Sequence, residues 1–122
     1  MRLLLDTNVV IRWHAGKLRP AAVRTVQRAE LVFVSAVTAW EIAMKRAAGK
    51  LRMDRLVEDI VTSNKFVPLP VSMRHGDLVR DLPLHHTDPF DRMLIVQALD
   101  EGLTILTADR AFEPYRVPVA WV

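Results

Sequence analysis

Short apolar runs alternate along the chain with longer segments whose apolar residues recur at helical spacing. The apolar runs predict strands at residues 2–5, 31–34, 66–71, 103–107 and 117–122. The amphipathic segments predict helices at about residues 9–14, 20–30, 36–48, 53–63, 73–82 and 89–100. Because strands alternate with helices throughout, we expect an α/β fold in which a mostly parallel sheet lies between helices.

Proline positions indicate which strands lie at the edges of this sheet. Pro68 and Pro70 remove backbone donors from one strand, and Pro118 removes a donor from the last one. By contrast, the three consecutive leucines of residues 3–5 are typical of a central strand that is buried on both faces. In sheets of this kind, ligands bind beyond the carboxyl ends of the strands, where the strand order reverses.

Four acidic residues lie where the hydrophobic pattern predicts buried side chains or strand ends. Asp6 and Asp109 directly follow two apolar strands, whereas Glu41 and Asp91 share the spacing of apolar residues on helices. Carboxylates that meet in one cleft repel each other and raise each other's pKa, and a divalent cation removes this repulsion. Oxygen ligands of this type favour Mg²⁺ or Mn²⁺.

Each acid also has an ordinary structural explanation. Glu41 is spaced to form an ion pair with Lys45 on the helix surface. Asp91 favours the N-terminus of a helix that Asp88 caps, and the two strand-end acids would suit caps or turns. Taken together these explanations are weaker than a shared site, because all four acids can converge in one cleft of an α/β fold.

Composition limits the compartment and the class of protein. The 122 residues suit one domain, and the absence of cysteine excludes disulfides and thiolate metal sites, so we expect a reducing, cytoplasmic environment. No apolar run is long enough for a membrane span, and the first run ends at Asp6, too early for a secretory signal. The net charge of +3 is a weak indication of a polyanionic partner.

Four segments, taken in order, resemble those of PIN-domain proteins, and specifically of VapC-type toxins from toxin–antitoxin pairs. The segments are Leu3–Asn8, Ser35–Ile42, His86–Arg92 and Leu106–Asp109. Each is weak alone, but the ordered set spans nearly the whole chain and keeps all four acids. The resemblance implies a single PIN domain over residues 1–122, folded as a three-layer α/β/α sandwich with sheet order 3-2-1-4-5 and an acidic pocket at the switch point.

The resemblance also implies an activity and partners. Such proteins are Mg²⁺- or Mn²⁺-dependent endoribonucleases, usually homodimeric, and a VapB-like antitoxin blocks the pocket with its C-terminal segment. The positions that match the catalytic and metal-binding acids are Asp6, Glu41, Asp91 and Asp109. Asn8 and Thr107 match polar positions that orient ligands or water in relatives.

Two groups of basic residues are candidates for guiding RNA to an acidic pocket. One contains Arg12, Lys17 and Arg19, and the other contains Lys45, Arg46, Lys50, Arg52 and Arg55. Within them we expect RNA contacts from Arg12, Lys45, Arg46 and Lys50. Solvated helix surface is the ordinary explanation for each, and contacts to phosphate would make affinity fall with salt.

Other functions stay open at this point. An aspartyl phosphatase would use Asp6 as its nucleophile, but that chemistry expects a second aspartate where Asn8 stands. A catalytically silent module that binds nucleic acid or an antitoxin, and a DNA nuclease, would share the same fold. The loop pair His85 and His86 is expected to be solvated surface, and His75 has no partner at metal-ligand spacing.

Overall fold

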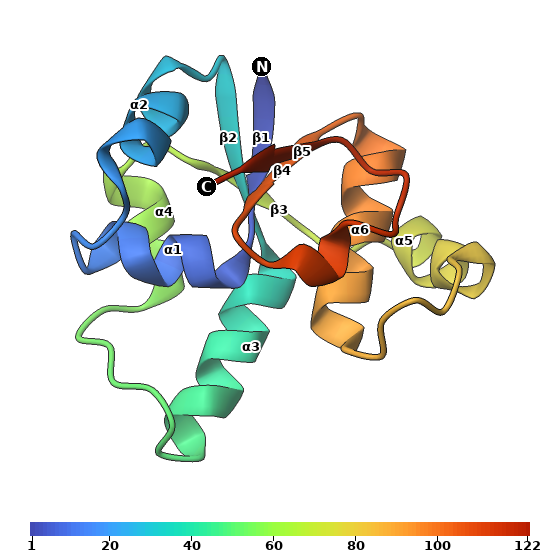
Figure 1. Ribbon diagram of the computed structural model, residues 1–122. Helices are drawn as coiled ribbons and strands as arrows, with labels where there is room; N and C mark the ends of the chain where they lie inside the picture. Colours follow the sequence, from blue (N-terminus) through green and yellow to red (C-terminus); the bar gives the residue numbers. More distant parts are fainter.

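A computed structural model describes all 122 residues and contains one five-stranded sheet between helices (Figure 1). The strands are β1 (Arg2–Leu5), β2 (Leu31–Ser35), β3 (Val67–Leu69), β4 (Thr104–Thr107) and β5 (Val119–Trp121). Their order is β3-β2-β1-β4-β5, and every neighbouring pair is parallel. The predicted fold class and strand order are therefore confirmed, and the sheet is parallel throughout.

Helices cover both faces of the sheet. They are α1 (Thr7–His14), α2 (Pro20–Arg28), α3 (Ala36–Ala47), α4 (Val57–Ser63), α5 (Met73–Leu78) and α6 (Pro89–Glu101). Two 3-10 turns follow, η1 (Val79–Asp81) after α5 and η2 (Arg110–Phe112) after β4. None of the helices combines the length and apolar character that crossing a bilayer requires.

The core forms two apolar clusters, one on each face of β1. Leu3 and Leu5 belong to the cluster that contains residues of α1, α2 and α4, whereas Leu4 belongs to the one that contains residues of α6. All three leucines are fully buried. The alternation of side chains along a strand explains this division, and the prediction of a central strand buried on both faces is confirmed.

The edges of the sheet agree with the proline pattern, but two helices differ from expectation. β3 and β5 are the edge strands. The helix expected from residue 53 begins only at Val57, because Asp54 is bound to His14 outside the helix and the first-turn acids come later, at Glu58 and Asp59. The helix expected to reach residue 82 ends at Leu78 and continues as the tighter turn η1.

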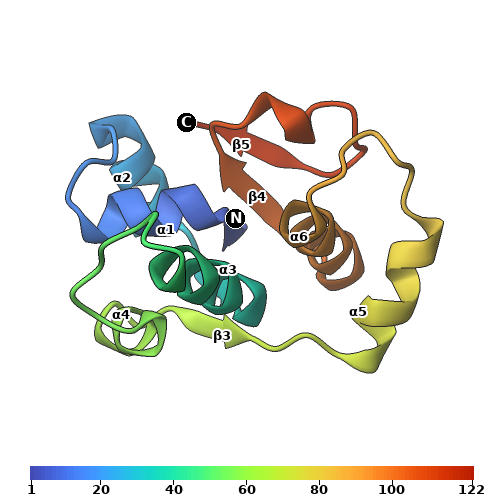
Figure 2. The same cartoon turned by 90° about the horizontal axis from the view of Figure 1, so that it is seen from below.

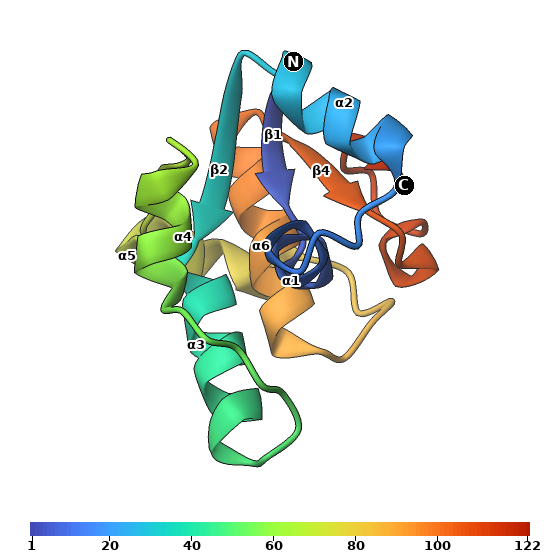
Figure 3. The same ribbon diagram turned by 90° about the vertical axis from the view of Figure 1, so that its left-hand side faces the viewer.

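The carboxyl ends of the central strands gather the starts of three helices. α1 and α3 begin directly after β1 and β2, and the α6 N-terminus lies near them (Figure 2). The backbone N–H of Asp6 donates to the carbonyl of Leu106 at 3.1 Å, which holds the ends of β1 and β4 together. From this point α3 projects beyond the sheet (Figure 3). The switch of strand order at β1 therefore places side chains from distant segments at one site.

Candidate active site

Asp6 lies at the carboxyl end of β1 with only 3% of its surface exposed. Thr107 Oγ1, at the end of β4, donates a hydrogen bond to Asp6 Oδ2 at 2.7 Å and accepts one from the Asp109 backbone N–H at 2.9 Å. Burial raises the pKa of Asp6 to about 6, although the Thr107 bond opposes this and repulsion from Glu41 and Asp109 adds to it. Thr107 therefore fixes the orientation of a carboxylate that is costly to ionise.

Glu41 lies on α3 and is 7% exposed. Its Oε2 forms an ion pair with Lys45 Nζ at 2.8 Å, and this carboxylate raises the pKa of Lys45. Its Oε1 is buried and has no hydrogen-bond partner. The ion pair with Lys45 that the ordinary explanation predicted is therefore present, but Glu41 is buried and does not lie on an exposed helix surface. An orphaned carboxylate oxygen carries a desolvation penalty that a ligand at this position would relieve.

Asp91 lies in the first turn of α6 and is 8% exposed. Asp88 caps this helix as expected, since its Oδ1 accepts from the backbone N–H of Asp91 at 3.3 Å and from that of the preceding residue at 2.8 Å. Burial raises the pKa of Asp91 to about 7, and repulsion from Asp6, Asp88 and Glu41 adds to the effect, while a bond from His86 opposes it. Asp91 therefore interacts electrostatically with the acids of β1 and α3.

Asp109 and Asn8 lie at the open side of the site. Asp109 is exposed, and its Oδ1 accepts from the Ala111 backbone N–H at 2.9 Å, so it also caps η2 as its ordinary explanation required. Asn8 is exposed in the first turn of α1. Both residues line one cavity with Asp6, of about 530 Å³.

The structure gathers the predicted acids around Asp6, without forming one tight cluster of ligand atoms. Glu41, Asp91 and Asp109 each repel or are repelled by Asp6. A set of ligand atoms close enough together to hold one metal ion, all within 4.8 Å of one another, comes instead from His86, Asp88 and Asp91. The buried orphaned oxygen of Glu41 and the raised pKa values of Asp6 and Asp91 fit a divalent cation, because added positive charge would offset the burial of all three groups.

His86 is a site residue that sequence reasoning missed. It was expected to be solvated, but it is half-buried, and its Nε2 donates to Asp91 Oδ2 at 2.9 Å. The sequence did contain a signal for this contact, because His86 lies two residues before the helix cap Asp88. A side chain at that position can fold back against the first turn of the helix, where Asp91 lies. His86 holds one oxygen of Asp91 in a fixed direction.

Arg92 and Tyr115 hold the loop that carries His86. Arg92 Nη1 donates to the carbonyl of Pro83 at 2.8 Å, and Nη2 donates to that of Leu82 at 3.1 Å. The hydroxyl of Tyr115 accepts from the backbone N–H of His86 at 3.0 Å and also lies 3.2 Å from Arg92 Nη1. Arg92, the residue after Asp91, and Tyr115, 24 residues after it, therefore together position His86 against Asp91.

A second group of possible ligand side chains consists of His75, Asp100 and Glu101, away from the four acids. His75 Nδ1 accepts from the backbone N–H of Ser72 at 3.0 Å, so the neutral ring carries its proton on Nε2, which faces Glu101 Oε1 at 3.0 Å. A ring in this tautomer has no free lone pair for a metal. His75 completes a capping box for α5, and we assign it a structural role.

The basic residues are placed in different surroundings. Arg12 lines the cavity beside Asp6, whereas Lys45 is bound to Glu41. Arg46 lines a separate hollow of about 700 Å³, which contains none of the four acids. Lys50 is exposed beyond the end of α3. Of the predicted contacts to RNA, Arg12 is thus the one that shares a cavity with the acidic site.

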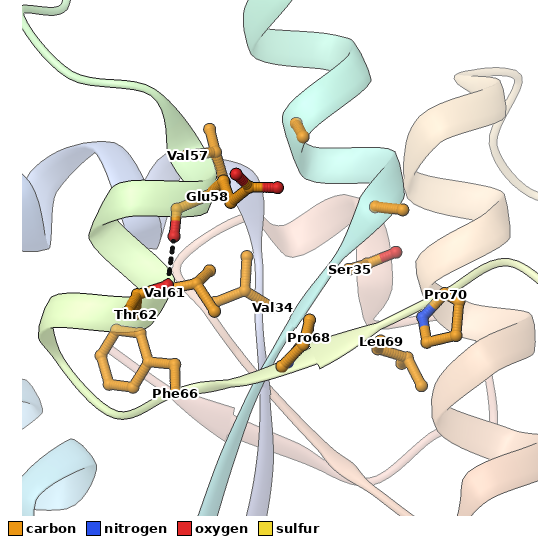
Figure 4. Close-up of a pocket in the computed structure, with 12 residues that line it drawn as sticks. Val34, Ser35, Val57, Glu58, Val61, Thr62, Phe66, Pro68, Leu69 and Pro70 are labelled. Carbon is orange, nitrogen blue, oxygen red and sulfur yellow. Dashed lines mark hydrogen bonds between the residues drawn. The ribbon is translucent and has the colours of Figure 1, made fainter.

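An apolar pocket between α3, α4 and β3 is separate from the acidic site (Figure 4). It encloses about 520 Å³, and Glu58 is the only charged residue among those that line it. The hydrogen bond drawn there runs from Thr62 Oγ1 to the carbonyl of Glu58 at 3.0 Å, within α4. None of the four acids reaches this pocket.

Comparison with solved structures finds the same fold in several other chains, one of them from a toxin–antitoxin complex. A chain of VapBC2 from Rickettsia felis bound to promoter DNA has a TM-score of 0.73 at 12% identity, with 98% of both chains covered. A chain of a toxin–antitoxin complex from Klebsiella pneumoniae gives 0.69 at 16% identity, covering 97% of this chain and 95% of that one. FitAcB from Neisseria gonorrhoeae gives 0.68 at 21% identity, covering 96% and 95%.

Comparison with models of protein families assigns this chain to a family. A search of curated protein sequences found no match. The family model of the PIN domain, however, matches residues 3–117, nearly the whole chain. This match includes all four acids and the strands and helices that position them. The chain therefore belongs to the PIN domain family.

Proposed function

We propose that this chain, as one PIN domain over residues 1–122, is an endoribonuclease that depends on Mg²⁺ or Mn²⁺. The single observation that carries the proposal is the burial of Asp6, Glu41 and Asp91 together at the carboxyl ends of a parallel sheet. The pKa values of Asp6 and Asp91 are raised there, and Oε1 of Glu41 has no hydrogen-bond partner. Membership of the PIN family supports it, because PIN domains are generally nucleases.

The reaction would be hydrolysis of a phosphodiester by water, in line with the leaving oxygen. A bound Mg²⁺ or Mn²⁺ would activate the water and stabilise negative charge on the leaving oxygen. Asp6, Asp91 and Asp109 would hold the cation. Glu41 would serve as a further ligand, or accept a hydrogen bond from the attacking water at its free Oε1.

The neighbouring side chains would keep these acids in place. Thr107 fixes one oxygen of Asp6, and His86 fixes one oxygen of Asp91. Lys45 offsets the charge of Glu41 through its other oxygen. Each acid therefore presents an oriented oxygen, and orientation is the main contribution that a protein makes at such a site.

We further propose that the protein is the toxin of a toxin–antitoxin pair, a VapC-like homodimer in the cytoplasm that a VapB-like antitoxin inhibits. The support is the resemblance of its four segments to VapC-type toxins and the fold that it shares with chains of VapBC and FitAB complexes. Co-expression with the product of a neighbouring small reading frame, followed by co-purification and loss of cleavage, tests this part.

The test of the activity is cleavage of a structured RNA by the purified protein in Mn²⁺ and in EDTA. Wild type should cleave only with the metal, and Asp6→Asn and Asp91→Asn should each reduce cleavage at least ~100-fold because they remove a ligand charge. Asp77→Asn, an exposed acid on α5, is the matched control and should cleave like wild type.

Three results would each overturn a part of the proposal. Equal cleavage by wild type and both site variants would reject the acids as the catalytic site. Cleavage of single-stranded DNA in place of RNA would reject the ribonuclease while keeping the nuclease site. Loss of RNA cleavage in every metal, with RNA binding retained, would favour the silent binding module.

A further inference from the structure

The cavity beside Asp6 combines acidic and basic side chains without pairing them. The residues that line it are Asp6, Asn8, Val9, Arg12, Leu18, Arg19, Ala108, Asp109 and Val122. Arg12 lies one helical turn after Asn8 on α1, and Arg19 is the residue that caps α2. Arg12 on α1 and Arg19 at the start of α2 therefore bring two guanidinium groups to the border of the acidic site.

Neither guanidinium is used by the fold. Arg12 and Arg19 form no ion pair and no side-chain hydrogen bond, and both are exposed. Arg92, by contrast, is fully engaged with its loop, and Arg110 stacks over the ring of Trp121 at 4.2 Å. Free guanidiniums present the planar pair of donors that binds phosphate oxygens most effectively.

The acidic site itself would repel a polyanion, so a substrate strand needs compensating positive charge close by. Lys45 cannot supply it freely, because it is bound to Glu41. The hollow that Arg46 and Arg52 line is also basic, but its acid is Asp54 and it shares no residue with the acidic site. The cavity of Arg12 and Arg19 is the one that joins free cations to Asp6 and Asp109.

We propose that this cavity is a subsite for one nucleotide of a single strand, adjacent to the phosphodiester that is cleaved, and that Arg12 and Arg19 bind the phosphate of that nucleotide. This inference rests on the proposed nuclease function. The volume of about 530 Å³ lies in the range of sites for small ligands. The apolar walls from Val9, Leu18 and Val122 suit the faces of a sugar and a base.

The test is binding of a fluorescein-labelled single-stranded RNA of ten nucleotides, measured by anisotropy in EDTA, where no cleavage occurs. The double variant Arg12→Gln/Arg19→Gln should weaken binding at least ~10-fold. The control Arg24→Gln/Arg28→Gln removes the same charge from exposed positions of α2 outside the cavity and should weaken it less than ~2-fold. The slope of log affinity against log salt should fall by about 0.7 for each lost phosphate contact, in the first variant only.

The outcomes separate this proposal from the nuclease function. Equal weakening by both double variants would show a general charge effect and overturn the subsite. RNA cleavage with unchanged KM in Arg12→Gln/Arg19→Gln would also overturn it, and would leave the nuclease standing. Selective loss of binding in a protein that cleaves no RNA would support phosphate binding by Arg12 and Arg19 and count against the nuclease. Binding of an acidic peptide, with no binding of RNA, would assign the cavity to a protein partner instead.

Discussion

Asp6 and Asp91 are each more than nine-tenths buried, yet neither forms an ion pair with lysine or arginine. Burial without a compensating cation raises their pKa values to about 6 and about 7. Stability alone would favour apolar residues at such positions, because buried carboxylates are costly. A cation that binds both carboxylates from solution would explain why Asp6 and Asp91 occupy these buried positions.

The first prediction concerns the stability of the metal-free protein. The folded protein keeps protons on Asp6 and Asp91 that the unfolded chain releases above about pH 4, so their stabilising contribution is complete below pH 4. It is lost as pH rises through about 6 and 7. In EDTA, Asp91→Asn should therefore raise the melting temperature by a few degrees at pH 8 and by much less at pH 5.

Thermal melts of wild type, Asp91→Asn and the control Asp77→Asn across this pH range test the point. A strong drop in melting temperature for Asp91→Asn at every pH would contradict it. That result would mean that the interaction of Asp91 with the α6 N-terminus outweighs its repulsion by the other acids.

The second prediction concerns His86 as a positioning residue. Its bond to Asp91 fixes one ligand oxygen, and outer partners of this kind are worth about 10–100-fold in metal affinity. His86→Ala should weaken Mn²⁺ binding by about that factor in calorimetry, and His86→Gln, which keeps an N–H donor, should restore part of it. His85→Ala is the matched neighbour and should bind like wild type; equal affinities in all four proteins would exclude this role.

Among helices and strands, the sequence gives the best predictions for segments whose own residues determine their structure. The leucine run of β1 and the prolines of β3 and β5 fix a central strand and two edges without reference to other segments. The predicted start of α4 at residue 53 is wrong, because Asp54 is bound by His14, which belongs to α1. Local patterns cannot show a contact between distant segments.

The same limit applies to the site. Burial and strand ends were enough to predict the positions of Asp6 and Asp91, but the partners of these acids come from tertiary contacts. His86 approaches Asp91 because Arg92 and Tyr115, which lies near the end of the chain, hold its loop. Arg19 was grouped with Arg12 by proximity in sequence, and only the fold shows that both line one cavity with Asp6.

The third prediction tests the hold of Tyr115 on this loop. Tyr115→Phe removes an acceptor of the His86 backbone N–H and a partner of Arg92, so it should lower the free energy of unfolding by about 1–2 kcal/mol. Urea denaturation measures this as a shift of the midpoint at constant slope. Mn²⁺ affinity should fall as well, though less than in His86→Ala. An unchanged midpoint would show that the loop is held without this hydroxyl.

At the scale of the whole molecule, the parallel sheet explains why one small chain can assemble this site. β1 occupies the centre, and its neighbours β2 and β4 belong to opposite halves of the strand order. The segments that follow these strands therefore meet at one edge, together with the start of α6 (Figure 2). The cavity of Arg12 and Arg19 opens at the same edge, so the acidic centre and its basic border are both products of the topology.

If carboxylates from separate segments share a divalent cation, diffraction from a crystal soaked in Mn²⁺ should show that cation. We expect an anomalous peak within about 2.0–2.4 Å of carboxylate oxygens of Asp6 and Asp91, with a further oxygen from Glu41 or Asp109 in its coordination sphere. A peak only at His75, Asp100 and Glu101, or none while the oxygens of Asp6 and Asp91 point away from each other, would contradict it.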